Sequence, residues 1–233
     1  MEKNKKLLLG AFLVLTALIL LGRLAFADTP PILYFMYGVR VLLFLGALKF
    51  LRRKRALLLP AFGATLFSDF FFILAKTFPT PMESRELWGM GGFILAYLLL
   101  LAAFFPRTRL RTVSYLGLLP FLGVFALVFQ ALRPYAEGAF FWVAIITGII
   151  LILTAWVLSG TLWGFSPFAA GPASWFLALA GIILFASDMV VAYSIFHPDF
   201  SGYFFWKEAL IWGTYVPGWT LILLASMDEE EKR

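Results

Sequence analysis

Long apolar runs separated by short polar segments dominate the chain. A helix needs roughly 20 apolar residues to cross a bilayer, and eight such runs follow one another along the 233 residues. They predict membrane-spanning helices over residues 7–24, 31–51, 56–76, 87–105, 112–132, 138–158, 173–196 and 205–227. Pro60 and Pro120 lie inside the third and fifth runs, which a membrane helix tolerates when neighbours satisfy the freed carbonyl groups.

The first run follows a basic start, as in a secretory signal peptide. It has no clear small-residue cleavage site, and its apolar stretch is long enough to span the membrane. We expect it to be retained as the first helix. No polar tract is long enough for a separate soluble domain, so we expect an all-α bundle forming one integral membrane domain over residues 1–233.

Basic residues cluster in alternate loops. The segments 3–6, 52–55 and 106–111 fall on one side of the membrane if the spans alternate, and basic loops face the cytoplasm. The tail 228–233 then lies on the same side, as an even number of spans requires. We expect both termini to be cytoplasmic, in a protein of the bacterial inner membrane.

Composition supports a lipid environment and removes several kinds of chemistry. Hydrophobic residues make up 62% of the chain and charged residues 14%, a balance outside the range of soluble domains. The net charge of +6 is explained by the basic loops, and no nucleic-acid partner is expected. The chain has no cysteine and a single histidine, His197, which excludes thiolate catalysis and a three-histidine metal site within one chain.

Three ionisable residues fall well inside the predicted spans: Arg40, Asp69 and Asp188. A charge at the bilayer centre costs at least about 2.5–3.5 kcal/mol, and such residues usually mark a functional site. A purely structural alternative pairs Arg40 with either aspartate as an internal salt bridge. One cation cannot neutralise two carboxylates, however, and two carboxylic acids in unequal surroundings can supply both a proton donor and a proton acceptor.

Each of the two aspartates follows a serine. Ser68 precedes Asp69 in the third span, and Ser187 precedes Asp188 in the seventh. The serines are candidates for hydrogen bonds between helices or for orienting a substrate. The third and seventh spans run in the same direction and carry these pairs at similar depth, which is compatible with a parallel four-plus-four repeat.

The last span carries a second set of candidates. Glu208, Trp212, Tyr215 and Trp219 follow one another at i, i+4, i+7 and i+11, so a helix places them on one face. The simpler interpretation is an aromatic packing seam near the membrane surface. The functional alternative is the wall of a lipid-tail pocket with one carboxylate at its mouth.

The two aspartate segments, "LFSDF" around Asp69 and "GIILFASDMVVAYSIF" around Asp188, resemble those of the YhhN-like membrane proteins, which include the lysoplasmalogenases. The segments "GMGGFILAYLLLLAAF" (89–104) and "GTYVPGWTLILLAS" (213–226) are similar to the Gly-rich fourth span and the Tyr-bearing last span of that family. The resemblance covers roughly residues 30 to 226. This chain departs from it at Tyr97, where a histidine is usual, and at Trp219, where a glutamine is usual.

The resemblance implies hydrolysis of the vinyl-ether bond of a lysoplasmalogen to a fatty aldehyde and a glycerophospho-head group. Asp69 and Asp188 would be the acid and base, in an order that the sequence leaves open. Arg40 would keep one aspartate ionised or bind the phosphate, and Tyr97 and Tyr215 would orient the substrate. The expected partner is a lipid or lysolipid, with no metal or organic cofactor.

A different class of function fits many of the same residues. A lipid-binding or solute-binding membrane protein, or a proton-coupled transporter, also places paired acids and a buried arginine inside its spans.

Overall fold

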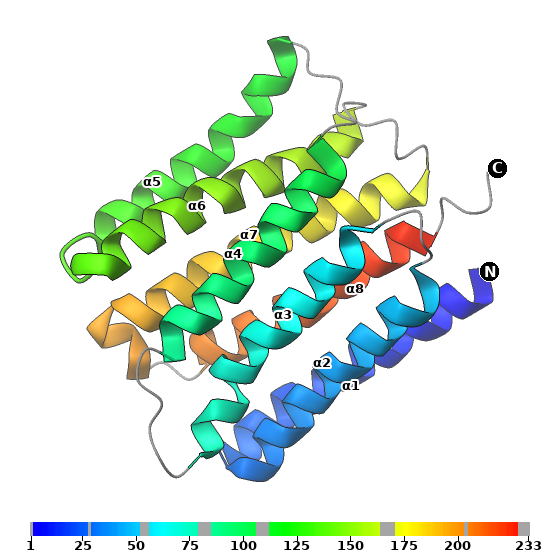
Figure 1. Ribbon diagram of the computed structural model, residues 1–233, viewed down its shortest axis with the longest axis horizontal. Helices are drawn as coiled ribbons and strands as arrows, with labels where there is room; N and C mark the ends of the chain where they lie inside the picture. Colours follow the sequence, from blue (N-terminus) through cyan, green and yellow to red (C-terminus); the bar gives the residue numbers. More distant parts are fainter. Residues whose placement is uncertain are drawn as a thin grey trace. The chain divides into compact units, whose positions relative to one another are not determined.

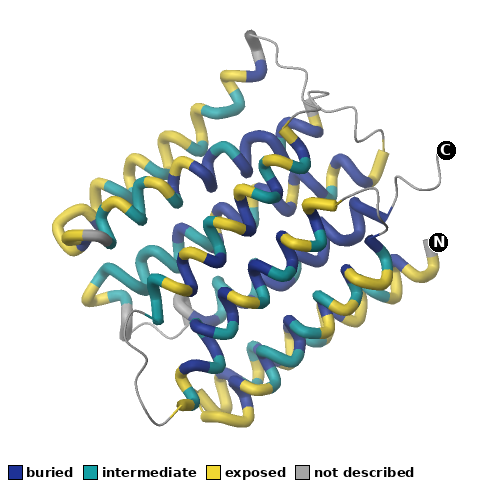
Figure 2. The backbone as a smooth tube through the Cα atoms, in the orientation of Figure 1, coloured by how far each residue is buried: buried dark blue, intermediate teal, exposed yellow. Residues whose placement is uncertain are grey.

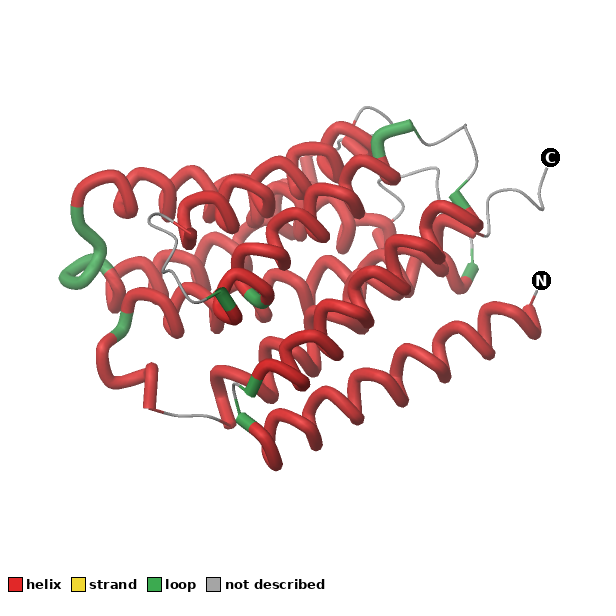
Figure 3. The backbone as a smooth tube through the Cα atoms, turned by 60° about the horizontal axis from the view of Figure 1, so that its bottom comes forward, coloured by secondary structure: helices red, strands yellow, loops and turns green. Residues whose placement is uncertain are grey.

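In the computed structural model, the described residues are 2–27, 29–51, 56–78, 85–105, 112–163, 171–202 and 205–227. Within these ranges the chain is almost entirely helical and contains no strand (Figure 3). Eight of the described helices are long and apolar enough to cross a membrane. The predicted all-α architecture with eight spans is therefore confirmed.

The helices agree closely with the apolar runs. Their bounds are α1 Glu2–Phe26, α2 Pro30–Phe50, α3 Leu58–Phe72, α4 Arg85–Phe104, α5 Leu119–Leu132, α6 Gly138–Ser159, α7 Pro172–Phe196 and α8 Ile211–Met227. Four of the spans include a helical segment of different pitch. A 3₁₀ helix (Leu74–Thr77) extends the third span, a 3₁₀ helix (Thr112–Leu118) begins the fifth, a 3₁₀ helix (Gly160–Trp163) ends the sixth, and a π-helix (Phe205–Leu210) precedes α8.

The two prolines expected inside spans lie where a helix begins. Pro60 is the third residue of α3, and Pro120 is the second residue of α5, directly after the 3₁₀ helix. The first turn of a helix has amide groups without an intrahelical acceptor, so a residue without an N–H group costs little there. Pro217, in contrast, lies inside α8.

Backbone contacts divide the chain into two compact units, residues 1–103 and 104–233. The first contains α1 to α3 and nearly all of α4, and the second contains α5 to α8 (Figure 1). The division falls after the fourth of eight spans. The parallel repeat and the single domain over residues 1–233 remain predictions.

In the first unit, α2 packs against both α1 and α3. The end of α3 is joined to the start of α4 by aromatic rings: Phe71 stacks on Trp88 with 6.3 Å between centroids, and Phe72 stacks on Phe93 at 5.6 Å. In α3, which carries Asp69, more than half of the span is buried. This helix is therefore the centre of the unit's packing.

In the second unit, α7 has its most extensive contacts with α8 and then with α6, while α5 packs on α6 (Figure 1). Burial follows the same order: α8 is buried along almost its whole length, whereas α5 is mostly exposed (Figure 2). In a membrane protein the exposed apolar faces contact lipid. The core of this unit is the α7–α8 pair, and α7 carries Asp188.

The predicted orientation rests mainly on segments 52–55, 106–111 and 228–233, which lie outside the described residues. The cytoplasmic location of both termini therefore remains a prediction from the basic loops.

Candidate functional site

A buried ion pair joins α2 to α3. Arg40 Nε donates to Asp69 Oδ2 at 2.5 Å, and each residue is at most 3% exposed. Arg40 lies near the middle of its span, where a charge in contact with lipid is costly. The carboxylate from the neighbouring helix offsets that cost. Of the two acids that Arg40 was expected to pair with, the structure therefore shows a salt bridge to Asp69.

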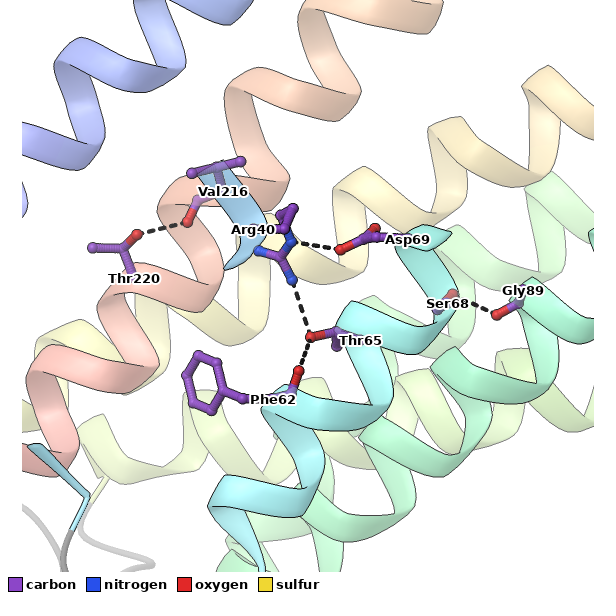
Figure 4. A network of polar contacts seen from close by, with 8 residues as sticks. All are labelled: Arg40, Phe62, Thr65, Ser68, Asp69, Gly89, Val216 and Thr220. Atoms are coloured by element: carbon purple, nitrogen blue, oxygen red, sulfur yellow. Dashed lines mark hydrogen bonds and ion pairs between the residues drawn. The ribbon is translucent and has the colours of Figure 1, made fainter. Parts of the chain in front are cut away.

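A threonine completes this contact. Arg40 Nη2 donates to Thr65 Oγ1 at 3.0 Å, and the Thr65 hydroxyl donates to the carbonyl oxygen of Phe62 at 2.9 Å (Figure 4). Thr65 lies four residues before Asp69, so both side chains project from the same face of α3. The guanidinium of Arg40 is thus held at two points one helical turn apart.

Ser68 connects the Asp69 segment to α4. Its hydroxyl donates to the carbonyl oxygen of Gly89 at 2.5 Å (Figure 4), and Ser68 is fully buried. The two helices approach closely because position 92 has no side chain. A Cβ atom added to Gly92 would lie 2.9 Å from Ser68 Cβ and 3.1 Å from the carbonyl oxygen of Ala64. Small residues commonly permit such close contact between membrane helices.

Two tyrosines of the first unit belong to the same helices. Tyr97, expected to orient a substrate, is buried on α4 and is 2% exposed. Tyr37 lies one turn before Arg40 on α2 and is half-buried. Its ring packs in a T-shaped arrangement against that of Phe70, the residue after Asp69, with 6.5 Å between centroids. Tyr37 is therefore the candidate hydroxyl that accompanies the ion pair.

The second serine–aspartate pair lies on α7 in the other unit. Ser187 is buried, and its hydroxyl donates to the carbonyl oxygen of Ile211 at 3.4 Å, which ties α7 to the first residue of α8. Asp188 is half-buried. It is more exposed than Asp69, so the two acids differ in burial.

The residues expected to share a face of the last span are all buried. Trp212 and Tyr215 meet edge to face with 5.9 Å between their ring centroids, and Trp219 is completely buried. Glu208 is also buried, but it lies in the π-helix that precedes α8. Short π-helical turns are frequent at functional sites, and this turn places the buried carboxyl group beside the start of α8.

Sequence reasoning did not identify Thr65 or Tyr37. The signal was present, because Thr65 is spaced four residues from Asp69 and Tyr37 three residues from Arg40. Those spacings place each residue on the same helix face as the charge. Neither residue is charged, however, and threonine and tyrosine are ordinary in membrane helices.

Eight apolar spans with charges buried among them define an integral membrane protein of helical-bundle type. Within that class, the sequence profile of the YhhN family matches residues 31–226. The chain belongs to the YhhN family, as its aspartate segments indicated. Neither a curated protein nor a solved structure matches it. The bacterial inner membrane remains a prediction.

Proposed function

We propose that this protein is a membrane-embedded hydrolase that cleaves the vinyl-ether bond of a lysophospholipid and releases a fatty aldehyde. Membership of the YhhN family and its resemblance to the lysoplasmalogenases support this reaction class. The observation that carries the proposal is the buried Arg40–Asp69 ion pair, a charged group kept at the centre of the span, where stability alone does not favour it.

The ion pair also suggests which aspartate donates the proton and which stabilises the cation. Arg40 favours the ionised form of Asp69, which suits that residue to stabilise a cation, so we assign proton donation to the second acid, Asp188. Asp188 protonates the β-carbon of the vinyl ether, and the α-carbon becomes an oxocarbenium ion. The negative charge of Asp69 stabilises that cation.

Water then completes the reaction. It adds to the oxocarbenium carbon while the Asp188 carboxylate, formed in the first step, accepts its proton, and the resulting hemiacetal collapses to a fatty aldehyde and the free hydroxyl of the glycerophospho-head group. One water molecule is consumed, and its proton replaces the one that Asp188 delivered. Tyr97 and Tyr215 are the proposed orienting hydroxyls, and no metal or organic cofactor takes part in these steps.

The experiment measures aldehyde release by the detergent-purified protein from a 1-alkenyl lysophospholipid. The matched 1-alkyl lipid serves as a control because it has no double bond to protonate. We expect Asp69→Asn and Asp188→Asn to lose roughly 10²–10⁴-fold in rate, the usual contribution of an acid or base. Asp199→Asn, on an exposed turn, should keep wild-type activity.

A well-folded wild-type protein that releases no aldehyde would overturn this proposal. The same intramembrane ion pair then favours the second candidate, a lipid-binding protein or proton-coupled transporter on the same fold. In that case Asp69→Asn would alter ligand binding or proton coupling.

A further inference from the structure

The Thr65 hydroxyl has its single proton committed. It donates to the carbonyl oxygen of Phe62 at 2.9 Å, within the same helix. A hydroxyl group has one donor and two acceptor positions, so the side of Thr65 Oγ1 that faces Arg40 acts only as an acceptor. It receives the Nη2 hydrogen bond at 3.0 Å in a site where Thr65 is 1% exposed.

The guanidinium of Arg40 is a rigid planar fork. The contact from Nε to Asp69 restrains the distance between the two groups. The second contact, from Nη2 to Thr65, also restrains the orientation of the plane (Figure 4). Both acceptors belong to α3, one turn apart, so this helix restrains the guanidinium through two of its N–H groups.

We propose that Thr65 is a positioning residue, which holds the Arg40 guanidinium in the orientation that directs Nε at Asp69. This inference rests on the proposed function in one respect, namely that Asp69 acts in catalysis. Thr65 acts through Arg40 and does not itself meet the substrate. Replacing it leaves both charges in place and loosens the geometry between them.

The competing explanation is that the Thr65 hydroxyl serves only its hydrogen bond to a carbonyl oxygen of its own helix. Buried threonines elsewhere do so: Thr220 on α8 is completely buried and donates to the carbonyl oxygen of Val216 at 2.8 Å. Figure 4 labels both threonines with these bonds drawn. Thr220→Val therefore removes an intrahelical hydroxyl bond like that of Thr65 and serves as the matched control.

The first measurement separates kcat from KM in the aldehyde assay for Thr65→Val, Thr65→Ser and Thr220→Val. We expect Thr65→Val to lower kcat about tenfold at unchanged KM, the pattern of an interaction made in the transition state. Serine retains the hydroxyl, so Thr65→Ser should recover kcat to within about twofold of the wild type. Equal effects of Thr65→Val and Thr220→Val on kcat would overturn the positioning role.

The second measurement does not depend on activity. Each valine substitution is combined with Arg40→Met, and the melting temperature in detergent is recorded; Arg40→Lys replaces Arg40→Met if the latter does not fold. We expect Thr65→Val to cost about 2–4 °C more than Thr220→Val in the wild-type background, and no more than Thr220→Val once Arg40 is gone. Absence of this coupling would overturn the inference.

The two measurements separate the inference from the proposed function. Coupling in an inactive wild-type protein would refute vinyl-ether hydrolysis and support the contact between Thr65 and Arg40. Coupling in an active protein whose kcat is unaffected by Thr65→Val would refute the positioning role alone.

Discussion

The two serine–aspartate segments, one in each unit, are built alike in one respect. Ser68 donates to the carbonyl oxygen of Gly89 in α4, and Ser187 donates to that of Ile211 in α8. In both cases a buried serine ties its helix to the beginning of the next spanning helix. The serines therefore link the helices that carry the aspartates to the spanning helices that follow them.

The aspartates themselves differ. Asp69 is buried in an ion pair with Arg40, and four residues earlier Thr65 accepts from the same arginine. Asp188 is half-buried, and the residue four positions before it is the buried, apolar Leu184. The aspartate of the same Ser-Asp dipeptide is thus buried in an ion pair in one unit and only half-buried in the other. Different environments for identical groups are what acid–base chemistry with two carboxyls requires.

The largest expected difference between the two segments is in stability. Asp69→Asn leaves the buried Arg40 without the carboxylate at 2.5 Å, and breaking a buried pair in this way costs about 3–5 kcal/mol. Asp188→Asn should cost less, because Asp188 is only half-buried. Unfolding by sodium dodecyl sulfate in mixed micelles measures both.

The control for that comparison is the double variant Arg40→Met/Asp69→Leu. It removes both charges and should regain most of the lost stability, because an apolar pair of similar volume often replaces a buried ion pair at no cost. Equal destabilisation by Asp69→Asn and Asp188→Asn would contradict the expectation that the buried ion pair makes Asp69 the more important of the two for stability.

A smaller effect is expected where α4 approaches the Asp69 segment. Gly92→Ala would bring a Cβ atom to within 3.0 Å of the Ser68 backbone nitrogen, and such overpacking costs about 1–3 kcal/mol. Gly91→Ala is the matched control, since nothing lies within 4 Å of its added Cβ atom. The comparison uses the same unfolding assay, and a neutral Gly92→Ala would show that the close contact does not restrain the helices.

The smallest effects belong to the serines. Ser68→Ala removes a hydrogen bond of 2.5 Å and should cost about 1 kcal/mol, whereas Ser187→Ala removes one of 3.4 Å and should cost about half of that or less. Melting temperatures in detergent, with Ser194→Ala as a control that loses only a bond to Val191 in its own helix, check this order. A larger drop in melting temperature for Ser187→Ala than for Ser68→Ala would show that the Ser187–Ile211 hydrogen bond is the stronger of the two.

Much of the fold was predictable from the sequence because the bilayer imposes a length. A span needs roughly 20 apolar residues, so the eight runs mark α1 to α8 with small shifts at their ends. Local backbone form was less predictable. The 3₁₀ helix Thr112–Leu118 and the π-helix Phe205–Leu210 belong to the same apolar runs as the α-helices that follow them. Hydropathy responds to length and composition, and it does not distinguish helices of different pitch.

The candidate site was predictable in its charges and not in its contacts. Arg40 and Asp69 stand out in the sequence because charges are rare inside spans. Their pairing depends on how α2 and α3 are rotated and staggered against each other, which many apolar sequences permit equally. Thr65 acquires its role only from that pairing, since its hydroxyl becomes an acceptor for Arg40 once the two helices are packed.

The sequence by itself therefore determined the number of spans and the all-α class, because both depend on the cost of exposing polar groups to lipid. It also determined the family, because the two aspartate segments can be recognised from their residues alone. Only the tertiary structure decided that Arg40 pairs with Asp69, that Thr65 holds the arginine, and that Asp188 is only half-buried. Contacts of that kind span two or three ångströms between helices, and a hydrophobic pattern carries no information at that scale.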